Sequence, residues 1–128
     1  MNFRPFFFTC KLQRIELCEK ELKDFIVDDG ARFLMLHVTI RNITNEILTM
    51  YKDDFMITFD NEGPFEAEDN FGIRNQLPDE YALKPQEEIS GCLVFIISSS
   101  AKKIMLSYTE YFDDESEGKT YKLKYKIG

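Results

Sequence analysis

The sequence predicts an all-β fold, an antiparallel two-layer sandwich of about seven to eight strands. Apolar and polar residues alternate with a period of two over most of the chain, which is the pattern of strands that turn one face to a core. Turn signals recur at short intervals, and no long helix is expected between them. A small barrel is the alternative architecture.

Residues 33–42 form the predicted central strand, because they alternate without a Gly or Pro. One face carries Leu34, Leu36, Val38 and Ile40. The other face is half apolar and carries Phe33, Met35, His37, Thr39 and Arg41. We therefore expect this second face to be partly covered, either near a sheet edge or by the chain's own loops.

The N-terminal segment has a shift in its alternation. Phe8, Cys10 and Leu12 keep one phase, whereas Ile15 and Leu17 keep the other. A bulge near Gln13 and Arg14 explains the shift and predicts one strand that ends near Cys18. Residues 12–26 also have apolar side chains at spacings of three and four, as in an amphipathic helix, which stays the alternative.

Shorter runs predict the remaining strands, at residues 47–51, 55–59, 89–97, 104–108 and 121–127. Turns are expected at residues 28–30 and 60–64, and a charged hairpin loop at residues 113–118. Residues 92–97 are all apolar, as in a strand covered on both faces. In the last strand, Lys122, Lys124 and Lys126 are expected to face water and protect a sheet edge from pairing.

Length and composition predict a single domain over residues 1–128. The chain is 44% hydrophobic, enough to bury a core without metal or disulfides. Its net charge of −7 disfavours direct binding to nucleic acid or to an anionic membrane, and favours a basic partner. Cys10, Cys18 and Cys92 lack any paired spacing, so we interpret them as buried small hydrophobes, which favours a reducing compartment.

No catalytic residue, cofactor site or metal site is predicted. His37 is the single histidine, and we interpret it as structural. The acidic clusters around Asp53, Asp60, Glu66 and Asp113 lack the spacing of a calcium loop, so solvated turns are expected. The Asn42-Ile43-Thr44 triplet fits the glycosylation pattern, which is common by chance. We therefore expect that the protein is not an enzyme.

Several motifs resemble a family of bacterial immunoglobulin-like domains of unknown function, found in secreted proteins and surface lipoproteins and related to a mycobacterial immunoprotective extracellular protein. The resemblance covers about residues 31–108 and rests on a strand that ends in Asn42 and on Pro85 followed by Gly91-Cys92-Leu93-Val94-Phe95. It implies an immunoglobulin-like β-sandwich. Gln86 stands where the family usually has Gly.

Residues 65–85 lose the alternation and mix acids with aromatics. Long loops of this kind are often functional. We predict partner-binding residues here, because aromatic side chains supply contact area while acids steer a basic partner. The candidates are Phe65, Glu66, Glu68, Asp69, Phe71 and Tyr81. The alternative is that Phe65 and Phe71 close the end of the sandwich.

Two functions fit these features. The first is a non-enzymatic protein-binding or accessory module of bacterial or phage origin, which uses its loops or a sheet face. The second is an acidic cytoplasmic inhibitor that docks on a basic groove of a nucleic-acid-processing or defence enzyme. We expect a monomer or weak homodimer with no membrane span, because no apolar run approaches about 18 residues. The N-terminal apolar run is too short for a signal sequence. If the chain is complete as given, we expect it in the cytoplasm. If a signal sequence was removed, we expect it in the cell envelope or outside the cell.

Overall fold

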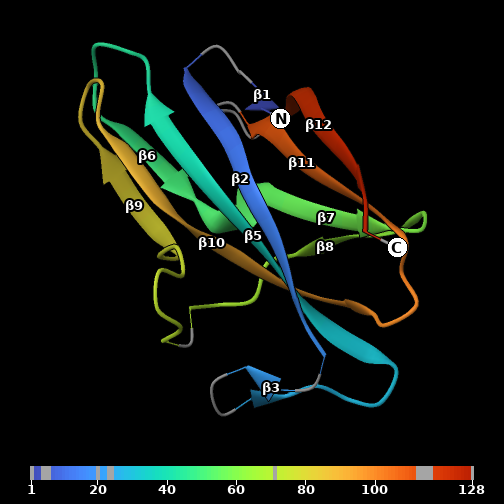
Figure 1. The fold of residues 1–128 in the computed structure, drawn as a ribbon. Helices are drawn as coiled ribbons and strands as arrows, with labels where there is room; N and C mark the ends of the chain where they lie inside the picture. The colour runs from blue at the N-terminus through green and yellow to red at the C-terminus, as the bar shows by residue number, and fades with distance from the viewer. Residues whose placement is uncertain are drawn as a thin grey trace.

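The computed structural model describes residues 2–3, 7–19, 21–22, 25–70, 72–111 and 117–127 as an immunoglobulin-like antiparallel β-sandwich (Figure 1). One sheet has the order β1-β2-β5-β10 and the other the order β12-β11-β7-β8. The predicted fold class is confirmed. The first sheet contains β1 (Asn2–Phe3), β2 (Phe8–Cys18), β5 (Ala31–Asn42) and β10 (Glu88–Ser98). The second contains β7 (Phe55–Phe59), β8 (Glu62–Glu66), β11 (Lys103–Tyr111) and β12 (Glu117–Lys126).

Two small strand pairs and one short turn complete the described structure. Strands β3 (Glu21–Leu22) and β4 (Phe25–Ile26) form a hairpin beyond the end of β2. Strands β6 (Leu48–Tyr51) and β9 (Glu80–Leu83) pair at the other end of the first sheet. A 3-10 turn (Lys52–Asp54) connects β6 to β7.

Strand β5 is the central strand of the first sheet, as predicted. It pairs with β2 on one side and with β10 on the other over nearly its whole length. Its inward side chains are all buried in the main core: Leu34, Leu36, Val38 and Ile40. Full burial of one such side chain contributes about 1.5–3 kcal/mol.

Asn42 ends β5 and joins three segments through its buried side chain. Its Nδ2 donates to the carbonyl oxygens of Glu46 (2.7 Å) and Leu83 (3.0 Å). Its Oδ1 accepts from the backbone N–H and the hydroxyl of Thr44, both at 2.8 Å. Every donor and acceptor of the amide is satisfied, which makes this residue a structural one.

Strand β2 settles the alternative left open for residues 12–26. It is a strand to Cys18, and its register against β5 shifts between Leu12 and Arg14. The predicted bulge is therefore confirmed, and the helix is wrong. The bulge lets Phe8 and Cys10, before it, and Ile15 and Leu17, after it, pack on the same core.

The outer face of the first sheet carries a second apolar cluster of Phe33, Met35, Cys92 and Val94. Leu22 and Val27 come from the β3–β4 hairpin region, and Ile73 comes from the long loop after β8. The chain's own loops thus cover part of this face, as predicted for the second face of β5. The prediction that β10 is covered on both faces is only partly correct, because the Ile96 side chain on this face is 41% exposed.

Strand β8 differs from the prediction, which placed a turn over residues 60–64 and no strand after it. Asp60 and Asn61 have φ values of 47° and 68°, and Phe59 pairs with Glu62. Positive φ at both central residues is typical of a tight two-residue hairpin, so the return strand begins at once. Gly63 and Pro64 are tolerated in this strand because β8 is an edge strand.

The predicted edge strand and the predicted free cysteines are both seen. Strand β12 is an edge strand, and Lys122, Lys124 and Lys126 are exposed. All three cysteines are free; Cys10 and Cys92 are buried, and Cys18 is half-buried. Most of the predicted charged hairpin loop, residues 112–116, lies outside the described residues.

Candidate protein-binding surface

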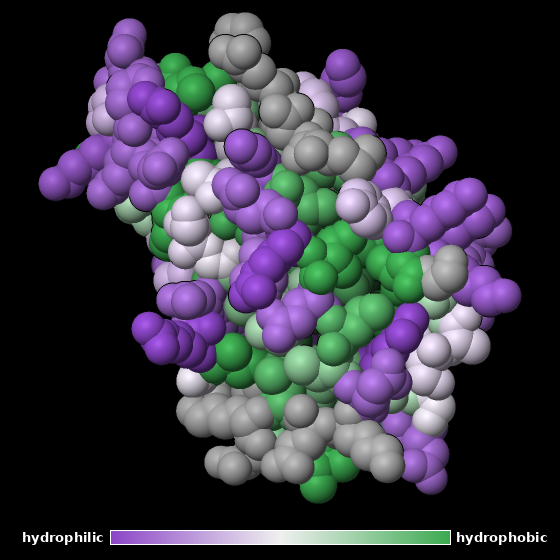
Figure 2. Space-filling view, viewed as in Figure 1, coloured by the Kyte–Doolittle hydropathy of each residue, from purple (hydrophilic) through white to green (hydrophobic). Residues whose placement is uncertain are grey.

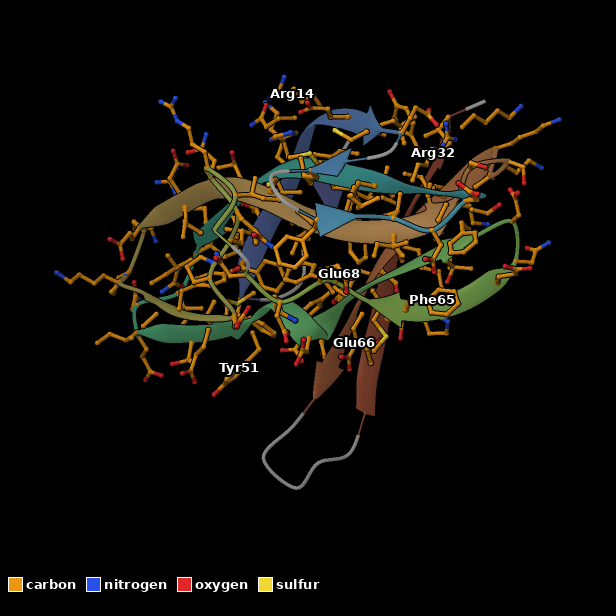
Figure 3. All side chains as sticks on the ribbon, turned by 90° about the horizontal axis from the view of Figure 1, so that it is seen from below. Arg14, Arg32, Tyr51, Phe65, Glu66 and Glu68 are labelled. Carbon is orange, nitrogen blue, oxygen red and sulfur yellow. The ribbon has the colours of Figure 1, made fainter. Side chains whose placement is uncertain are left out.

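The structure brings four of the six predicted contact residues to one margin of the sandwich. Phe65 and Glu66 end strand β8, and Glu68 and Asp69 follow in the loop that leaves it. Figure 3 shows Phe65, Glu66 and Glu68 together, on the side away from Arg14 and Arg32. Phe71 lies outside the described residues.

Phe65 is both a packing residue and an exposed aromatic. It stands opposite Ile57 in the β7–β8 ladder, and its ring stacks on Phe59 with centroids 5.4 Å apart and planes at 23°. It remains 46% exposed. The two alternatives from the sequence are thus combined, because one side of the ring closes the core and the other faces solvent.

A buried lysine holds the loop that carries Glu68 and Asp69. Lys52 Nζ donates to Asp53 Oδ1 (2.6 Å), Asp69 Oδ1 (2.9 Å) and the Ala67 carbonyl oxygen (3.1 Å). Burial lowers the pKa of Lys52, but the hydrogen bonds and charges of Asp53 and Asp69 outweigh it, so the net pKa is raised. The Glu68 backbone N–H donates to the Val94 carbonyl oxygen at 2.7 Å.

This anchoring changes the interpretation of Asp69. Sequence reasoning assigned its carboxylate to steering a partner, whereas in the structure the carboxylate pairs with Lys52. No ion pair within the described ranges involves Glu66 or Glu68. These two acids are the ones available to attract a basic surface.

A shallow apolar hollow lies beside this loop, on the outer face of the first sheet. Its volume is about 300 Å³, and Glu68 and Asp69 form part of its rim. Phe33 on β5 and Ile96 on β10 are direct cross-strand partners in its wall, and the β3–β4 hairpin adds Phe25 and Ile26. Phe25 is 52% exposed and Ile26 77% exposed. We call this set (Phe25, Ile26, Phe33, Ile96, Glu68 and Asp69) the apolar hollow.

Hydrophobic surface extends down the face of the molecule that Figure 2 shows, toward the end that carries the β3–β4 hairpin. Sequence reasoning missed Phe25, Ile26 and Ile96 as surface residues. A signal was present, since adjacent residues in a strand point to opposite faces, so a core on one face of the hairpin can bury only one of Phe25 and Ile26.

Tyr81 does not belong to this surface. It lies on β9, its ring packs against the main core, and its buried hydroxyl has no hydrogen-bond partner within the described residues. Burial raises the pKa of Tyr81 strongly, and Cys10, Tyr108 and Asp54 add smaller contributions. Tyr81 thus packs apart from Phe65, Glu66 and Glu68, and its contact role stays a prediction.

The described part of the chain has no feature that suggests a metal centre or a spanning helix. No group of three His, Cys, Asp or Glu side chains is arranged there to hold a metal ion. No helix among these residues has the length and apolar character needed to cross a membrane. His37 pairs with Glu16, with Nε2 and Oε1 3.0 Å apart, as expected of a structural histidine.

The fold and this surface define an immunoglobulin-like β-sandwich domain with an exposed apolar hollow rimmed by acids. The chain belongs to the family described as Domain of unknown function (DUF4352), whose model matches residues 12–121. This confirms the resemblance inferred from the sequence motifs. No curated protein matches the chain.

Solved bacterial structures share the fold. The Bacillus subtilis protein ycdA, provisionally described as a lipoprotein, is 17% identical with a TM-score of 0.73, and the match covers 95% of this chain and 38% of that one. The B. subtilis yjhA protein is 15% identical with a TM-score of 0.69, covering 84% and 78%. An uncharacterized β-sandwich protein from Clostridium difficile is 15% identical with a TM-score of 0.51, covering 100% and 90%. At these identities the likeness shows the fold alone.

Proposed function

We propose that this domain is a non-enzymatic protein-binding module and that its partner docks on the apolar hollow. The observation that carries the proposal is the exposure of Phe25, Ile26 and Ile96 around one hollow. Contiguous exposed apolar surface with a polar rim is typical of protein interaction sites. Aromatic and aliphatic anchors at the centre of such a surface carry most of the binding energy.

The acids at this margin indicate which kind of partner surface would complement the site. Glu68 lies on the rim of the apolar hollow, Glu66 precedes it at the end of β8, and the whole chain carries a net charge of −7. A partner that presents an apolar side chain among lysines or arginines complements both features. Such charges raise the association rate and its dependence on salt more than they raise the affinity.

A cell-envelope location is part of this proposal. Its support is the similarity to the ycdA protein, provisionally described as a lipoprotein, of which this chain spans 38% of the length. The net charge of −7 is the observation that favours the alternative, an acidic inhibitor of a cytoplasmic enzyme with a basic groove. The identity of the captured partner distinguishes the two.

The test compares two exposed isoleucines at different places on the molecule. Ile26 lines the apolar hollow and is 77% exposed, whereas Ile47, between β5 and β6, lies outside the hollow and is 70% exposed. Each residue is changed to Ser in a separate variant, and each variant is used as bait to capture proteins from an extract of the native host. We expect Ile26→Ser to lose the specific partner and to weaken its binding by about 1–3 kcal/mol, with Ile47→Ser unchanged. Equal binding by both variants contradicts the proposal.

A further inference from the structure

A second hollow lies on the outer face of the second sheet and is lined by lysines. Its volume is about 530 Å³, and it forms where β11 begins and β12 ends, beside the β7–β8 turn. These three segments meet next to the mark C in Figure 1, away from the β3–β4 hairpin. The residues that matter are Lys103, Lys124 and Lys126, with Asn61 and Asp60 at the turn. We call them the lysine hollow.

The three lysines lie on one face of the sheet, and none has an acidic partner among the described residues. Lys103 and Lys126 are direct cross-strand partners, and Lys124 is the next residue of β12 on the same face. Like charges placed directly opposite each other destabilise a sheet. None of the three forms an ion pair within the part of the chain that the structure describes.

Asp60, the one acid among the described lining residues, accepts hydrogen bonds from the backbone. Its Oδ1 accepts the backbone N–H groups of Lys102 (3.1 Å) and Lys103 (3.0 Å). It therefore fixes the turn against the start of β11. Among the described lining residues, three ammonium groups against one carboxylate leave the hollow positively charged in a protein whose overall charge is −7.

Protection of a sheet edge explains only part of this arrangement. It accounts for Lys124 and Lys126, because β12 is an edge strand. It does not account for Lys103, because β11 lies between β12 and β7. A strand in the interior of a sheet has no free edge to protect, so the like-charge pair requires another reason.

We propose that the lysine hollow binds a phosphate-bearing ligand with at least two negative charges. Lysine ammonium groups bind phosphate as point charges with freely rotating donors, and the Asn61 amide adds a further donor. The volume is within the range of small-molecule sites. The overall negative charge is no obstacle, because salt screens charges beyond about 8 Å at physiological ionic strength, so the local lysines dominate.

The ligand is a soluble phosphate compound or the phosphate headgroups of a lipid surface, and two titrations distinguish these sources. The purified domain is titrated with inorganic tripolyphosphate by calorimetry, and separately with phosphatidylglycerol vesicles in a sedimentation assay. The double variant Lys103→Gln/Lys124→Gln removes the site. The matched control Lys11→Gln/Lys84→Gln removes the same charge from exposed residues elsewhere.

We expect saturable binding to one of the two ligands, weakened at least about tenfold in the hollow variant and unchanged in the control. Tripolyphosphate should also raise the melting temperature of the wild type and of the control more than that of the hollow variant if the ligand is soluble. The ligand that binds identifies the source. Absence of binding to both, or equal weakening in both variants, overturns the proposal.

Discussion

Gln86 shows at the scale of one residue how a family preference follows from backbone conformation. It lies in the turn before β10 and has a φ of 66°. Its backbone N–H donates to the Asn42 carbonyl oxygen at 2.9 Å, so the turn is fixed to the end of β5. A left-handed conformation favours Gly, which explains why the family usually has Gly at this position.

We predict that Gln86→Gly stabilises the domain slightly. Relief of the left-handed strain gains about 1–2 kcal/mol. Greater freedom of the unfolded chain and loss of the exposed hydrogen bond from Arg41 (3.3 Å) offset part of that gain. The net increase in the free energy of unfolding should be up to about 1 kcal/mol, measured by urea denaturation.

Lys11→Gly is the matched control for this substitution. Lys11 is an exposed residue inside β2, where the backbone is extended. Glycine there should lower the free energy of unfolding by about 0.5–1 kcal/mol. Equal destabilisation by both substitutions would show that the turn carries no strain.

At the scale of elements, the strands with clear alternation could be predicted from the sequence. Strand β5, the bulge in β2 and the edge strand β12 follow from the phase of their apolar residues. Strand β8 could not be predicted, because Glu62-Gly63-Pro64 has the composition of a turn and becomes a strand only by pairing with β7. The local sequence pattern contains no information about this long-range pairing, which stabilises the strand.

The candidate site was predictable only in part for the same reason. The sequence indicated Phe65, Glu66 and Glu68, which lie in one segment. It did not indicate that Phe25 and Ile26, far earlier in the chain, come to lie in one hollow with Glu68. Nor did it distinguish Asp69, which pairs with Lys52, from acids that are available to a partner.

The Lys52–Asp69 ion pair leads to a prediction for the loop after β8. Asp69→Ala removes one of three partners of a buried ammonium, so the loop should open more often. We expect hydrogen exchange of the Glu68 amide, which bonds to Val94, to become about fivefold faster, equivalent to about 1 kcal/mol. Two-dimensional NMR of the exchanging protein measures this rate.

Glu66→Ala is the control, because Glu66 is an acid nearby that forms no ion pair within the described chain. In the Glu66→Ala variant, the Glu68 amide should exchange at the wild-type rate. An unchanged rate in Asp69→Ala would mean that Asp53 and the Ala67 carbonyl oxygen hold Lys52 without Asp69.

At the scale of the whole molecule, the protein should be sensitive to alkali. Burial raises the pKa of the Cys10 thiol from 9.0 to about 12. Burial also raises the pKa values of Tyr81 and Tyr108, with smaller contributions from neighbouring charges. Above pH 9 the folded state therefore holds more protons than the unfolded state, so stability is complete below pH 9 and is lost as the pH rises toward 12.

We predict that ionisation of Cys10 alone lowers the free energy of unfolding by about 2 kcal/mol between pH 8 and pH 10.5. Between the unfolded and folded pKa values of the thiol, the free energy of unfolding falls by about 1.4 kcal/mol per pH unit. Urea denaturation at the two pH values measures the difference. Cys10→Ala should lower stability at pH 8 but reduce its dependence on pH. An identical pH dependence in the variant would remove Cys10 as a cause.

The two outer faces of the sandwich differ in chemistry. The first sheet carries the apolar hollow with its acidic rim, and the second carries the lysine hollow. The two hollows use different strands, so the proposed protein partner and the proposed phosphate-bearing ligand should not compete for the same residues. Variants in one hollow should leave the binding of the other unchanged.

Site-specific photo-crosslinking in the native host tests the central claim, docking of a partner at the apolar hollow, most directly. A photoreactive phenylalanine analogue is placed at position 26 or, as the control, at position 47, both exposed in the free domain. Illumination should join one discrete protein to position 26 and none to position 47. The same product from both positions, or no product from position 26 while a partner is captured through another face, contradicts the account.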